Sequence, residues 1–332
     1  MIGASRYRIV LALLSAVTAA LFVLSLVTGP AGIGFSDALA SLYSGGDQGA
    51  GLIMREIRLP RAILGLMIGI TLGLSGAALQ GYLRNPLAEP GLLGISASAS
   101  LGAVIAIYTG FSAVFPLGLP LAALVGSVVA VLVVQAMAGA RGGALTVILA
   151  GVAVSSFAAA MTSLALNLSP NPFAALEIMF WMLGSLTDRS MTHVWLAGPF
   201  MVAGWAMLAA LGRPLDALTL GEDAAQALGT DLRRTRLRLL IGTAIGVGGA
   251  VAVSGSIGFV GLIVPHLIRP LTDRSPSAIL LPSAIGGAAL LTLADLGVRI
   301  IPTTNELKLG VVTAFLGVPV FLVHLMRERR LW

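Results

Sequence analysis

The chain has 332 residues, of which 57% are hydrophobic and only 10% are charged, whereas an ordinary soluble domain is about 25% charged. A soluble globular protein is therefore excluded. The formal net charge of +6 does not indicate nucleic-acid binding, because the arginines stand between apolar segments, where they act as topology signals. The absence of cysteine excludes disulfides, thiolate metal sites and cysteine nucleophiles.

The apolar segments predict an all-α polytopic membrane protein. About 20 apolar residues suffice to cross a bilayer, and the uncharged run from Pro90 to Ala140 is long enough for two crossings. The first run follows Arg6 and Arg8 and is longer than the apolar core of a signal peptide, so we expect a retained helix. Breaks at glycine, proline and charge predict about ten helices in one transmembrane domain, residues 1–332, at 9–28, 60–82, 92–108, 117–138, 144–166, 193–211, 237–257, 258–270, 276–298 and 306–326.

The eighth of these helices is the least regular. Gly255, Gly258, Gly261 and Pro265 interrupt a run that is too short to span a bilayer comfortably. The pattern is typical of the broken or half-length helices of transporters.

The basic residues predict that both termini lie in the cytoplasm. In that arrangement the inner loops carry fourteen of the 20 lysines and arginines, while the acidic residues divide evenly between the two sides. Only lysine and arginine orient membrane proteins, so the bias fits an even number of crossings. Six cations then lie on the outer side against the rule: Arg55, Arg58, Arg61, Arg189, Arg299 and Lys308.

A weak internal repeat links the second and seventh helices. Arg61, Gly65, Gly69 and Gly73 recur at the same spacing as Arg238, Gly242, Gly246 and Ala250. The two helices run in opposite directions, as in the inverted repeats of transporters, although glycine-rich membrane helices also give such matches by chance. Stripes of small residues let membrane helices pack backbone to backbone.

The stretch 219–229, T-L-G-E-D-A-A-Q-A-L-G, predicts a short cytoplasmic helix. Thr219 and Glu222 form a capping box, Asp223 adds negative charge near the N-terminus, and Gly229 ends the helix. Two interpretations remain open: an interfacial connector, or a docking element for a soluble partner. Docking would use a face of small apolar residues, which comprises Ala224, Ala225 and Leu228.

A second cytoplasmic stretch, R-N-P-L-A-E-P-G-L-L-G, begins at Arg84. Pro86, Pro90 and Gly91 predict a tight, rigid turn. An ordinary helix connection would explain the prolines, but it would not explain why Arg84 and Glu89 flank them, with Asn85 following Arg84 directly.

The outer arginines allow two explanations. A ring made of Arg58, Arg61 and Arg299 could receive carboxylates from an acidic partner and orient its association. Alternatively, these side chains could extend to lipid phosphates.

Little in the chain points to catalysis or to ion coupling. His266, Asp295 and His324 are the ionisable residues at membrane depth, and none is placed near a midplane as a coupled carrier requires. The G-L-S-G motif around Ser75, with His266 or His324 as base, weakly suggests an intramembrane protease, but glycine and serine at helical spacing usually serve packing. No phosphate-binding loop G-x-x-x-x-G-K-[ST] and no H-E-x-x-H motif occurs, so any ATP would be bound by another subunit.

Several sequence blocks together resemble the FecCD-like (BtuC-like) permeases of bacterial type II ABC importers, which take up ferric siderophores, haem and cobalamin. The blocks follow the family order along nearly the whole chain: R-L-P-R-A at Arg58, R-N-P-L-A-E-P-G-L-L-G at Arg84, L-A-G-V-A at Leu149, W-M-L-G-S-L at Trp181, L-G-E-D-A-A-Q-A-L-G at Leu220, G-S-I-G-F-V-G-L-I-V-P-H-L-I-R at Gly255, A-D-L-G-V-R at Ala294 and G-V-V-T-A-F-L-G-V-P-V-F-L at Gly310.

This resemblance implies a homodimer of ten-helix permease subunits in the bacterial inner membrane, with two cytoplasmic ATPase subunits that carry ATP and Mg, and a periplasmic binding protein. No cofactor is expected on this chain. The family's coupling helix matches Gly221 to Gly229, its docking arginines match Arg58, Arg61 and Arg299, and its cytoplasmic gate matches Gly143 and Ala144.

The resemblance leaves the cargo open between two classes. The block at Trp181 is more similar to iron-chelate permeases than to cobalamin permeases, so an iron chelate, siderophore or haem is expected, with cobalamin as the alternative and an ion-coupled carrier as a more distant one. The chain departs from the family before the last helix, where E-L-K-L-G places Lys308 at a position that is usually proline.

Overall fold

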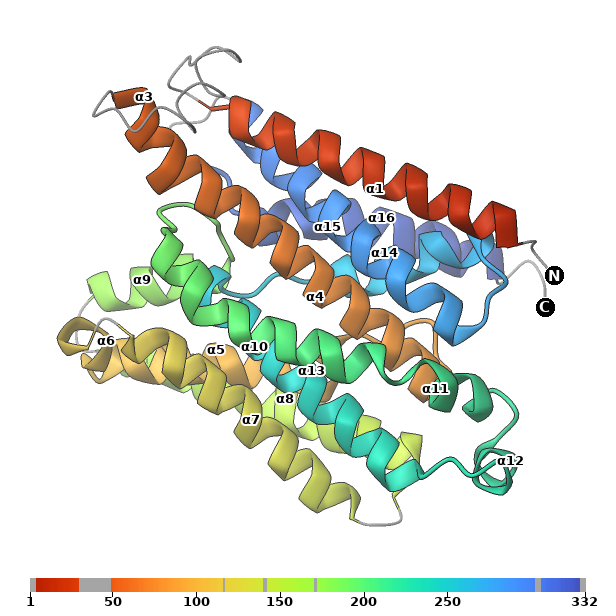
Figure 1. The fold of residues 1–332 in the computed structure, drawn as a ribbon. Helices are drawn as coiled ribbons and strands as arrows, with labels where there is room; N and C mark the ends of the chain where they lie inside the picture. Colours follow the sequence, from red (N-terminus) through yellow and green to blue (C-terminus); the bar gives the residue numbers. More distant parts are fainter. Residues whose placement is uncertain are drawn as a thin grey trace.

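The computed structural model describes residues 4–29, 49–115, 117–139, 142–169, 172–301 and 306–328, and the secondary structure of these residues is helical (Figure 1). The protein is a polytopic membrane protein, since seven of the described helices are long and apolar enough to span a bilayer. In chain order the elements are α1 (Ala4–Val27), α3 (Gly49–Leu52), η1 (Ile53–Arg58), α4 (Leu59–Leu83), η2 (Pro90–Leu93), α5 (Ile95–Tyr108), α6 (Phe111–Val114), α7 (Gly118–Ala138), α8 (Ala144–Asn167), α9 (Pro172–Met182), α10 (Met191–Ala209), α11 (Gly212–Leu218), α12 (Glu222–Ala227), α13 (Leu232–Ser254), α14 (Val260–Ile268), η3 (Arg269–Leu271), α15 (Pro276–Ile300) and α16 (Leu309–Glu328).

Glycine allows the two most extensively packed helices, α4 and α15, to touch along their backbones. A Cβ atom on Gly69 would collide with the carbonyl oxygen of Gly287, one on Gly287 with that of Gly69, and one on Gly73 with that of Ser283. Lipid provides no hydrophobic force between helices, so this close van der Waals contact is what holds them together. The glycine stripe predicted in the second helix is therefore a packing surface.

The bundle has an inner set of helices and an outer set. In α4 and α13, 78% of the most apolar window is buried, whereas in α1 only 6% is buried. Figure 1 shows α1 lying along the outside of the bundle over α15. The side chains of α1 therefore face lipid, and the small residues of the inner helices form the core.

Each of the ten predicted ranges contains a helix, but the second helix begins earlier than expected. Pro60 predicted a start at residue 60, yet the chain is already helical from Gly49 and passes through the π-helical turn η1, Ile53–Arg58. Proline lacks an amide hydrogen and its ring crowds the preceding turn. The wider π-turn before Pro60 accommodates both effects without ending the helix.

Helix α9 was not predicted at all. It occupies Pro172–Met182, in a stretch expected to connect the fifth and sixth helices. Its 11 residues are too few to cross a bilayer, so a search for spanning segments passes over it.

The eighth predicted helix is short, as its glycines suggested. Helix α13 ends at Ser254, and α14 covers nine residues. Between them Gly255 and Phe259 both have positive φ angles, of 70° and 67°. Left-handed backbone at these two positions turns the chain before α14 begins.

The two ends of the bundle carry different short elements. Figure 1 shows α12 at the same end as the first turn of α1 and the last turn of α16, while α3, α6 and α9 lie at the opposite end. We call the first the α12 end and the second the α9 end.

Candidate functional site

The predicted cytoplasmic helix 219–229 is shorter than expected and is capped differently. Thr219 ends α11, where its hydroxyl donates a hydrogen bond to the carbonyl oxygen of Asp216 at 2.6 Å. Gly221, with φ of 103°, precedes α12 and has no side chain to cap it. The predicted capping box between Thr219 and Glu222 is therefore wrong, because the last turn of α11 already uses the threonine.

The predicted stop at Gly229 is confirmed. Gly229 has a φ of 84°. Its amide donates a hydrogen bond to the carbonyl oxygen of Gln226 at 2.8 Å, and the amide of Thr230 donates one to the carbonyl oxygen of Ala225 at 2.9 Å. A left-handed glycine with these two bonds is a standard way to satisfy the last carbonyls of a helix.

The two faces of α12 differ from those expected. Ala225, predicted to lie on the docking face, is completely buried against the rest of the protein. The apolar residues that project are Leu220 and Leu228, which are 67% and 66% exposed, while Ala224 is half-buried and Glu222 and Asp223 are exposed. The surface that α12 offers is therefore a pair of leucines beside acidic side chains, with Ala225 as its anchor.

Helix α12 lies beside the predicted gate. Gly143 precedes α8 and Ala144 is its first residue. A Cβ atom on Gly143 would lie 3.9 Å from a carboxylate oxygen of Glu222. A cavity of about 400 Å³ lies between α12 and the segment that connects α7 to α8. It is lined by Tyr82, Gly142, Leu218, Glu222, Gln226, Thr230, Asp231, Leu232, Arg233 and Arg236.

Arg236 on α13 forms hydrogen bonds to the segment that connects α7 to α8. Arg236 is 3% exposed, and its guanidinium donates to the carbonyl oxygens of Gly139, at 2.7 Å, and Gly142. These carbonyls lie at the end of α7 and just before α8. One side chain thus links α13, which directly follows α12, to both sides of the connection between α7 and α8.

The predicted rigid turn after α4 is built by local hydrogen bonds. Arg84 ends α4 in a left-handed conformation, with φ of 49°. The side chain of Asn85 accepts the amide hydrogen of Leu87 at 2.9 Å. Pro90 then opens the short helix η2. The turn is as tight as its prolines indicated.

Glu89 links this turn to the irregular segment between α13 and α14. Its carboxylate accepts a hydrogen bond from the amide of Phe259, the left-handed residue before α14. Burial raises the pKa of Glu89, and the hydrogen bond only partly offsets that effect. Glu89 therefore joins two irregular segments that are far apart in the sequence.

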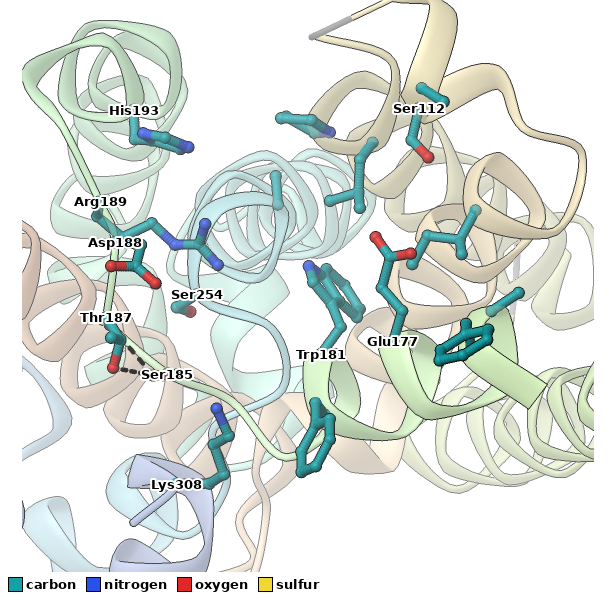
Figure 2. Close-up of a pocket in the computed structure, with 18 of the residues that line it drawn as sticks. Ser112, Glu177, Trp181, Ser185, Thr187, Asp188, Arg189, His193, Ser254 and Lys308 are labelled. Carbon is teal, nitrogen blue, oxygen red and sulfur yellow. Dashed lines mark hydrogen bonds between the residues drawn. The ribbon is translucent and has the colours of Figure 1, made fainter. Parts of the chain in front are cut away.

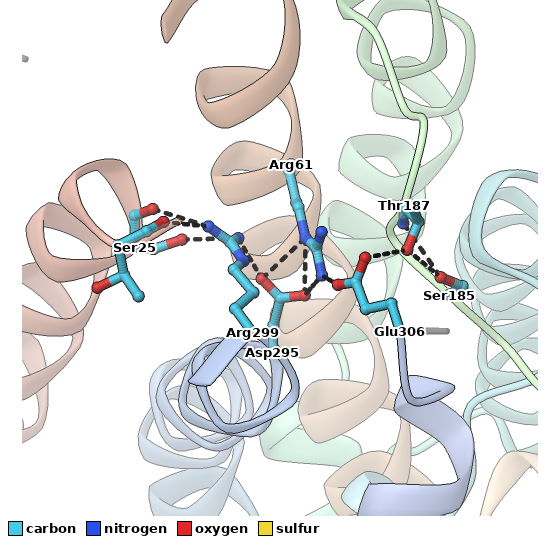
Figure 3. Close-up of polar contacts among 8 residues, drawn as sticks. Ser25, Arg61, Ser185, Thr187, Asp295, Arg299 and Glu306 are labelled. Atoms are coloured by element: carbon cyan, nitrogen blue, oxygen red, sulfur yellow. Dashed lines mark hydrogen bonds and ion pairs between the residues drawn. The ribbon is translucent and has the colours of Figure 1, made fainter. Parts of the chain in front are cut away.

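At the α9 end, charged residues form a network between helices (Figure 3). Arg61 on α4 donates to both carboxylate oxygens of Asp295 on α15, at 2.8 to 3.2 Å, and also to Glu306. Arg299 bonds the same Asp295 and reaches back to the carbonyl oxygen of Ser25 on α1 at 2.8 Å. The network joins α1, α4, α15 and the segment before α16.

Glu306 is the outer member of this network and also accepts a hydrogen bond from Thr187 at 2.9 Å. Burial would raise the pKa of Glu306, but the hydrogen bond and charge of Arg61, together with the bond from Thr187, outweigh it. The pKa of this carboxyl therefore lies below its usual value.

The three arginines predicted as an exposed docking ring are not exposed. Arg58 is 4% exposed and donates to the carbonyl oxygens of Leu26 and Val27 at 2.9 and 2.8 Å. The side chains of Arg61 and Arg299 are 11% and 5% exposed. Membrane helices bury charge only when it is paired, and here the partners come from the same chain. The expected ring is therefore wrong about exposure, and docking at this end stays a prediction.

A polar cavity of about 750 Å³ opens near α9. Figure 2 shows Glu177 and Trp181 of α9 on one side, Arg189 and His193 on the other, and Lys308 at the lower edge of the view. The ammonium of Lys308, at the position that departs from the family pattern, lies 5.4 Å from the ring centre of Phe180, within range of a cation–π contact. The cavity offers both charges and aromatic surface to a ligand.

The alternatives to transport gain no support from the described residues. Ser75 is fully buried in α4 and its hydroxyl has no hydrogen-bond partner, so no histidine is in place as its base. Asp295 is held by two arginines. His324 belongs to α16, but its side chain lies outside the described residues.

Sequence reasoning missed Arg236, Glu306 and Glu177 as site residues. Arg236 was one of several cations in a basic run, and it was not distinguished from its exposed neighbours. Glu306 was read as part of a motif that lacked its proline, and Glu177 as part of a connection. A helix-face count from Arg236 to the buried Leu239 and Leu240 was the one signal that could have found a buried arginine.

A bundle of spanning helices, with cavities at one end and a short exposed helix beside an interhelical connection at the other, has the architecture of a membrane permease. The chain belongs to the FecCD transport family, whose profile matches residues 17–327. It has the type II ABC importer fold and is a permease subunit of such an importer, without ATPase activity of its own.

Curated relatives and a solved structure agree with this assignment. The chain is 40% identical over 283 residues to the uncharacterized ABC transporter permease YvrB of Bacillus subtilis, covering 84% of this chain and 80% of that one. It is 38% identical over 292 residues to the cobalamin import permease BtuC of Halobacterium salinarum, with coverage of 87% and 77%. A solved inward-facing conformation of a metal-chelate type ABC transporter superposes with a TM-score of 0.83 at 28% identity, covering 96% of this chain and 99% of that one.

Proposed function

We propose that this chain forms the transmembrane pathway of an ATP-driven importer of metal chelates, with a second copy of itself and two cytoplasmic ATPase subunits. The observation that carries the proposal is the pair of exposed leucines that flank α12, Leu220 and Leu228, on either side of a helix whose Glu222 lies beside the connection between α7 and α8. A soluble ATPase subunit would bind this pair of leucines. When the two ATPase subunits close around ATP, they would move α12.

Motion of α12 would reach the membrane through two links. The carboxylate of Glu222 lies beside Gly143, and Arg236 at the start of α13 holds the carbonyls of Gly139 and Gly142. A shift of α12 and α13 would therefore displace the beginning of α8. This is the kind of packed two-state element that alternating access requires.

A second copy would cover apolar surface that one subunit leaves open. Leu145, Leu149 and Phe157 on α8 are 68%, 61% and 64% exposed, and Phe315 on α16 is 77% exposed. In a homodimer these faces would meet and form the pathway between subunits. Both termini would lie in the cytoplasm with α12, and a periplasmic binding protein would deliver cargo at the α9 end.

An iron chelate, siderophore or haem, is the cargo that the W-M-L-G-S-L block supports. Cobalamin is the second candidate, and a specific observation favours it, namely that relatives 37–38% identical to this chain carry cobalamin or vitamin B12 in their names. Both are large metal chelates. The polar and aromatic cavity beside α9 suits either cargo.

Transport in proteoliposomes tests the proposal. Permease and partner ATPase are reconstituted together, the binding protein is added outside, and uptake of a labelled ferric siderophore, haem and cyanocobalamin is compared with and without ATP. We expect ATP-dependent uptake of one class that the other classes do not inhibit. Uptake by the permease alone, driven by an ion gradient, would refute ATP coupling and support a secondary carrier.

A further inference from the structure

A cavity of about 310 Å³ lies at the α12 end, where the end of α4 meets η3 and the start of α15. We call it the Arg84 cavity. Arginines from three segments line it: Arg84 after α4, Arg269 in η3 and Arg274 before α15. The bias of basic residues toward one side of a membrane protein accounts for arginines at one end, but it does not require three of them to line one cavity.

The positive charge of this cavity is not balanced by its own lining. Among the described residues, no aspartate or glutamate lines it. Two carboxylates on adjoining segments are used locally. Asp216 accepts a hydrogen bond from the amide of Ser277 at 2.9 Å, and Asp273 accepts one from the amide of Ser275 at 3.0 Å. Three guanidinium groups without a carboxylate among them favour an anionic ligand.

Arg269 is oriented by a buried glutamine. Gln80 is 2% exposed, and its side-chain nitrogen donates to the carbonyl oxygens of Gly261 and Leu262, at 3.3 and 3.2 Å. Its side-chain oxygen accepts a hydrogen bond from Arg269 at 3.1 Å. The glutamine therefore holds this guanidinium in place, and a cation that is ordered in advance loses less conformational entropy when an anion binds.

The other two arginines occupy backbone positions that do not suit them. Arg84 and Arg274 are left-handed, with φ angles of 49° and 68°, and glycine or asparagine would adopt this conformation more easily. Both residues are exposed, and neither side chain makes a hydrogen bond or ion pair with a described residue. Neither the backbone nor a contact within the described chain explains arginine here, which points to a ligand from outside.

One edge of the cavity adjoins the surface proposed to bind the ATPase. Thr219 lines the cavity and directly precedes Leu220, which is 67% exposed and flanks α12. A partner that covers Leu220 therefore lies next to the Arg84 cavity and can place a side chain in it.

We propose that the Arg84 cavity receives an acidic side chain of the ATPase subunit, whose carboxylate accepts hydrogen bonds from Arg84 and Arg274 beside the charge of Arg269. The inference rests on the proposed function and adds a charged contact to the apolar one made by Leu220 and Leu228. The charged contact orients the ATPase against the ends of α4 and α15. It also gives a reason for an arginine to flank the rigid turn after α4, which an ordinary helix connection does not.

The first test is the affinity of the full-length permease for the purified ATPase, measured by surface plasmon resonance at low and high salt. Arg84→Asn and Arg274→Asn remove both charges and keep a residue that tolerates left-handed backbone. We expect the double variant to bind at least about tenfold more weakly at low salt and to depend less on salt than the wild type. Its thermal midpoint should not fall, because asparagine suits both backbone positions.

The second test identifies the acidic group by crosslinking. The chain has a single lysine, Lys308, which lies beside Phe180 of α9 at the opposite end. Arg84→Lys therefore introduces an amine where the sequence has none, and a carbodiimide joins an amine to a carboxylate only when the two are in contact. We expect a permease–ATPase product linked through an aspartate or glutamate of the ATPase. Arg213→Lys, at an exposed position of α11 outside the cavity, should give little product.

Two results would overturn the inference. The first is unchanged ATPase affinity in the double variant while Leu228→Asp weakens binding, which would leave the proposed function standing. Phosphatidylglycerol that native mass spectrometry then finds on the wild type, but not on the double variant, would make this a lipid headgroup site. The second is equal crosslinking in Arg84→Lys and Arg213→Lys. A wild-type permease that does not bind the ATPase at all would instead refute the proposed function itself.

Discussion

Arg236 of α13 donates hydrogen bonds to the carbonyl oxygens of Gly139 and Gly142, and so holds the end of α7 and the approach to α8 against the helix that follows α12. The two carbonyls need two parallel donors, which a guanidinium supplies and an ammonium does not. The arginine is buried, so the contact is shielded from water and stiff. Together with the approach of Glu222 to Gly143, it connects the α12 region to the predicted gate.

Replacing Arg236 by lysine should therefore separate ATP hydrolysis from transport. The charge is kept and the fold should survive, but one side chain no longer spans both carbonyls. We expect transport per ATP hydrolysed to fall at least about tenfold, the loss of roughly one charged hydrogen bond, in proteoliposomes where both rates are measured. Arg234→Lys, an exposed position on the same helix, should keep the wild-type ratio; a parallel loss there would contradict the specific role of Arg236.

The exposed leucine pair gives a direct test of the docking surface. Leu228→Asp places a charge where an apolar contact is proposed, without touching the buried core, because Leu228 is 66% exposed. Truncating or charging an apolar anchor typically weakens an interface by about 2 kcal/mol or more, so affinity for the partner ATPase should fall about 30-fold. Surface plasmon resonance with the purified ATPase measures the change.

Leu271→Asp is the matched control for this experiment, since Leu271 is also exposed, at 39%, but belongs to η3. Ala225→Arg would be a poorer test, although the sequence placed Ala225 on the docking face. Ala225 is completely buried, so its variant would disturb folding as well as docking. Normal ATPase affinity in Leu228→Asp would reject α12 as the docking element.

The sequence predicted the positions of the long helices better than it predicted the polar contacts. Apolar length and the positions of glycine and proline depend on local composition, so all ten predicted ranges contain helices. The contacts of Arg61 and Arg299 depend on Asp295 and Glu306, which are more than 200 residues from Arg61 in the sequence. No local pattern pairs Arg61 with these distant carboxylates, so its burial could not be predicted. Asp295 and Arg299, by contrast, stand four residues apart on one helix, a spacing that does indicate an ion pair.

The predicted helix boundaries were wrong where one residue could act in two ways. Thr219 fits an N-cap before α12, but its hydroxyl bonds back to Asp216 and ends α11 instead. Pro60 fits a helix start, but a π-helical turn carries the helix through it. Both choices are decided by the chain that precedes the residue, which local propensity does not describe.

The charge network should contribute strongly to stability. Asp295 is 3% exposed and binds both Arg61 and Arg299, so Asp295→Asn leaves two buried cations with a weaker acceptor. Breaking a buried ion pair from one side typically destabilises by about 3–5 kcal/mol, and the thermal midpoint in detergent should drop by several degrees. Asp188→Asn, in an exposed left-handed position that asparagine also tolerates, should change the midpoint little. Equal midpoints for both variants would show that the network is not a structural element.

Backbone contact between α4 and α15 predicts a position-specific effect of alanine. Gly287→Ala would place a methyl group against the carbonyl of Gly69, and overpacking of this kind costs about 1–3 kcal/mol. Gly297→Ala lies on the same helix, where a Cβ atom meets nothing within 4 Å, and should be neutral or stabilising by up to about 1 kcal/mol. Thermal midpoints of the two variants measured side by side check this; a stable Gly287→Ala protein would mean that the helices can separate freely.

Glu89 should make stability depend on pH in a direction opposite to that of a salt-bridged carboxylate. Its pKa is raised by burial, so the folded state binds the proton more tightly than the unfolded state does. The stabilisation is fully present below the ordinary carboxyl pKa and is lost as pH rises through the raised value. Glu89→Gln keeps an oxygen to accept the amide of Phe259 but cannot ionise, and should therefore be at least as stable as the wild type at neutral pH.

Thermal midpoints measured from about pH 4 to about pH 8 separate the effect of Glu89 from that of other groups. The difference between wild type and Glu89→Gln should grow in favour of the variant as pH rises, because ionising the wild-type carboxyl in its buried site becomes unavoidable. Glu56→Gln, which removes a carboxylate at an exposed position, is the matched control for the change of side chain. A difference between Glu89→Gln and the wild type that stays constant with pH would mean that Glu89 titrates equally in both states and that its burial has no electrostatic consequence.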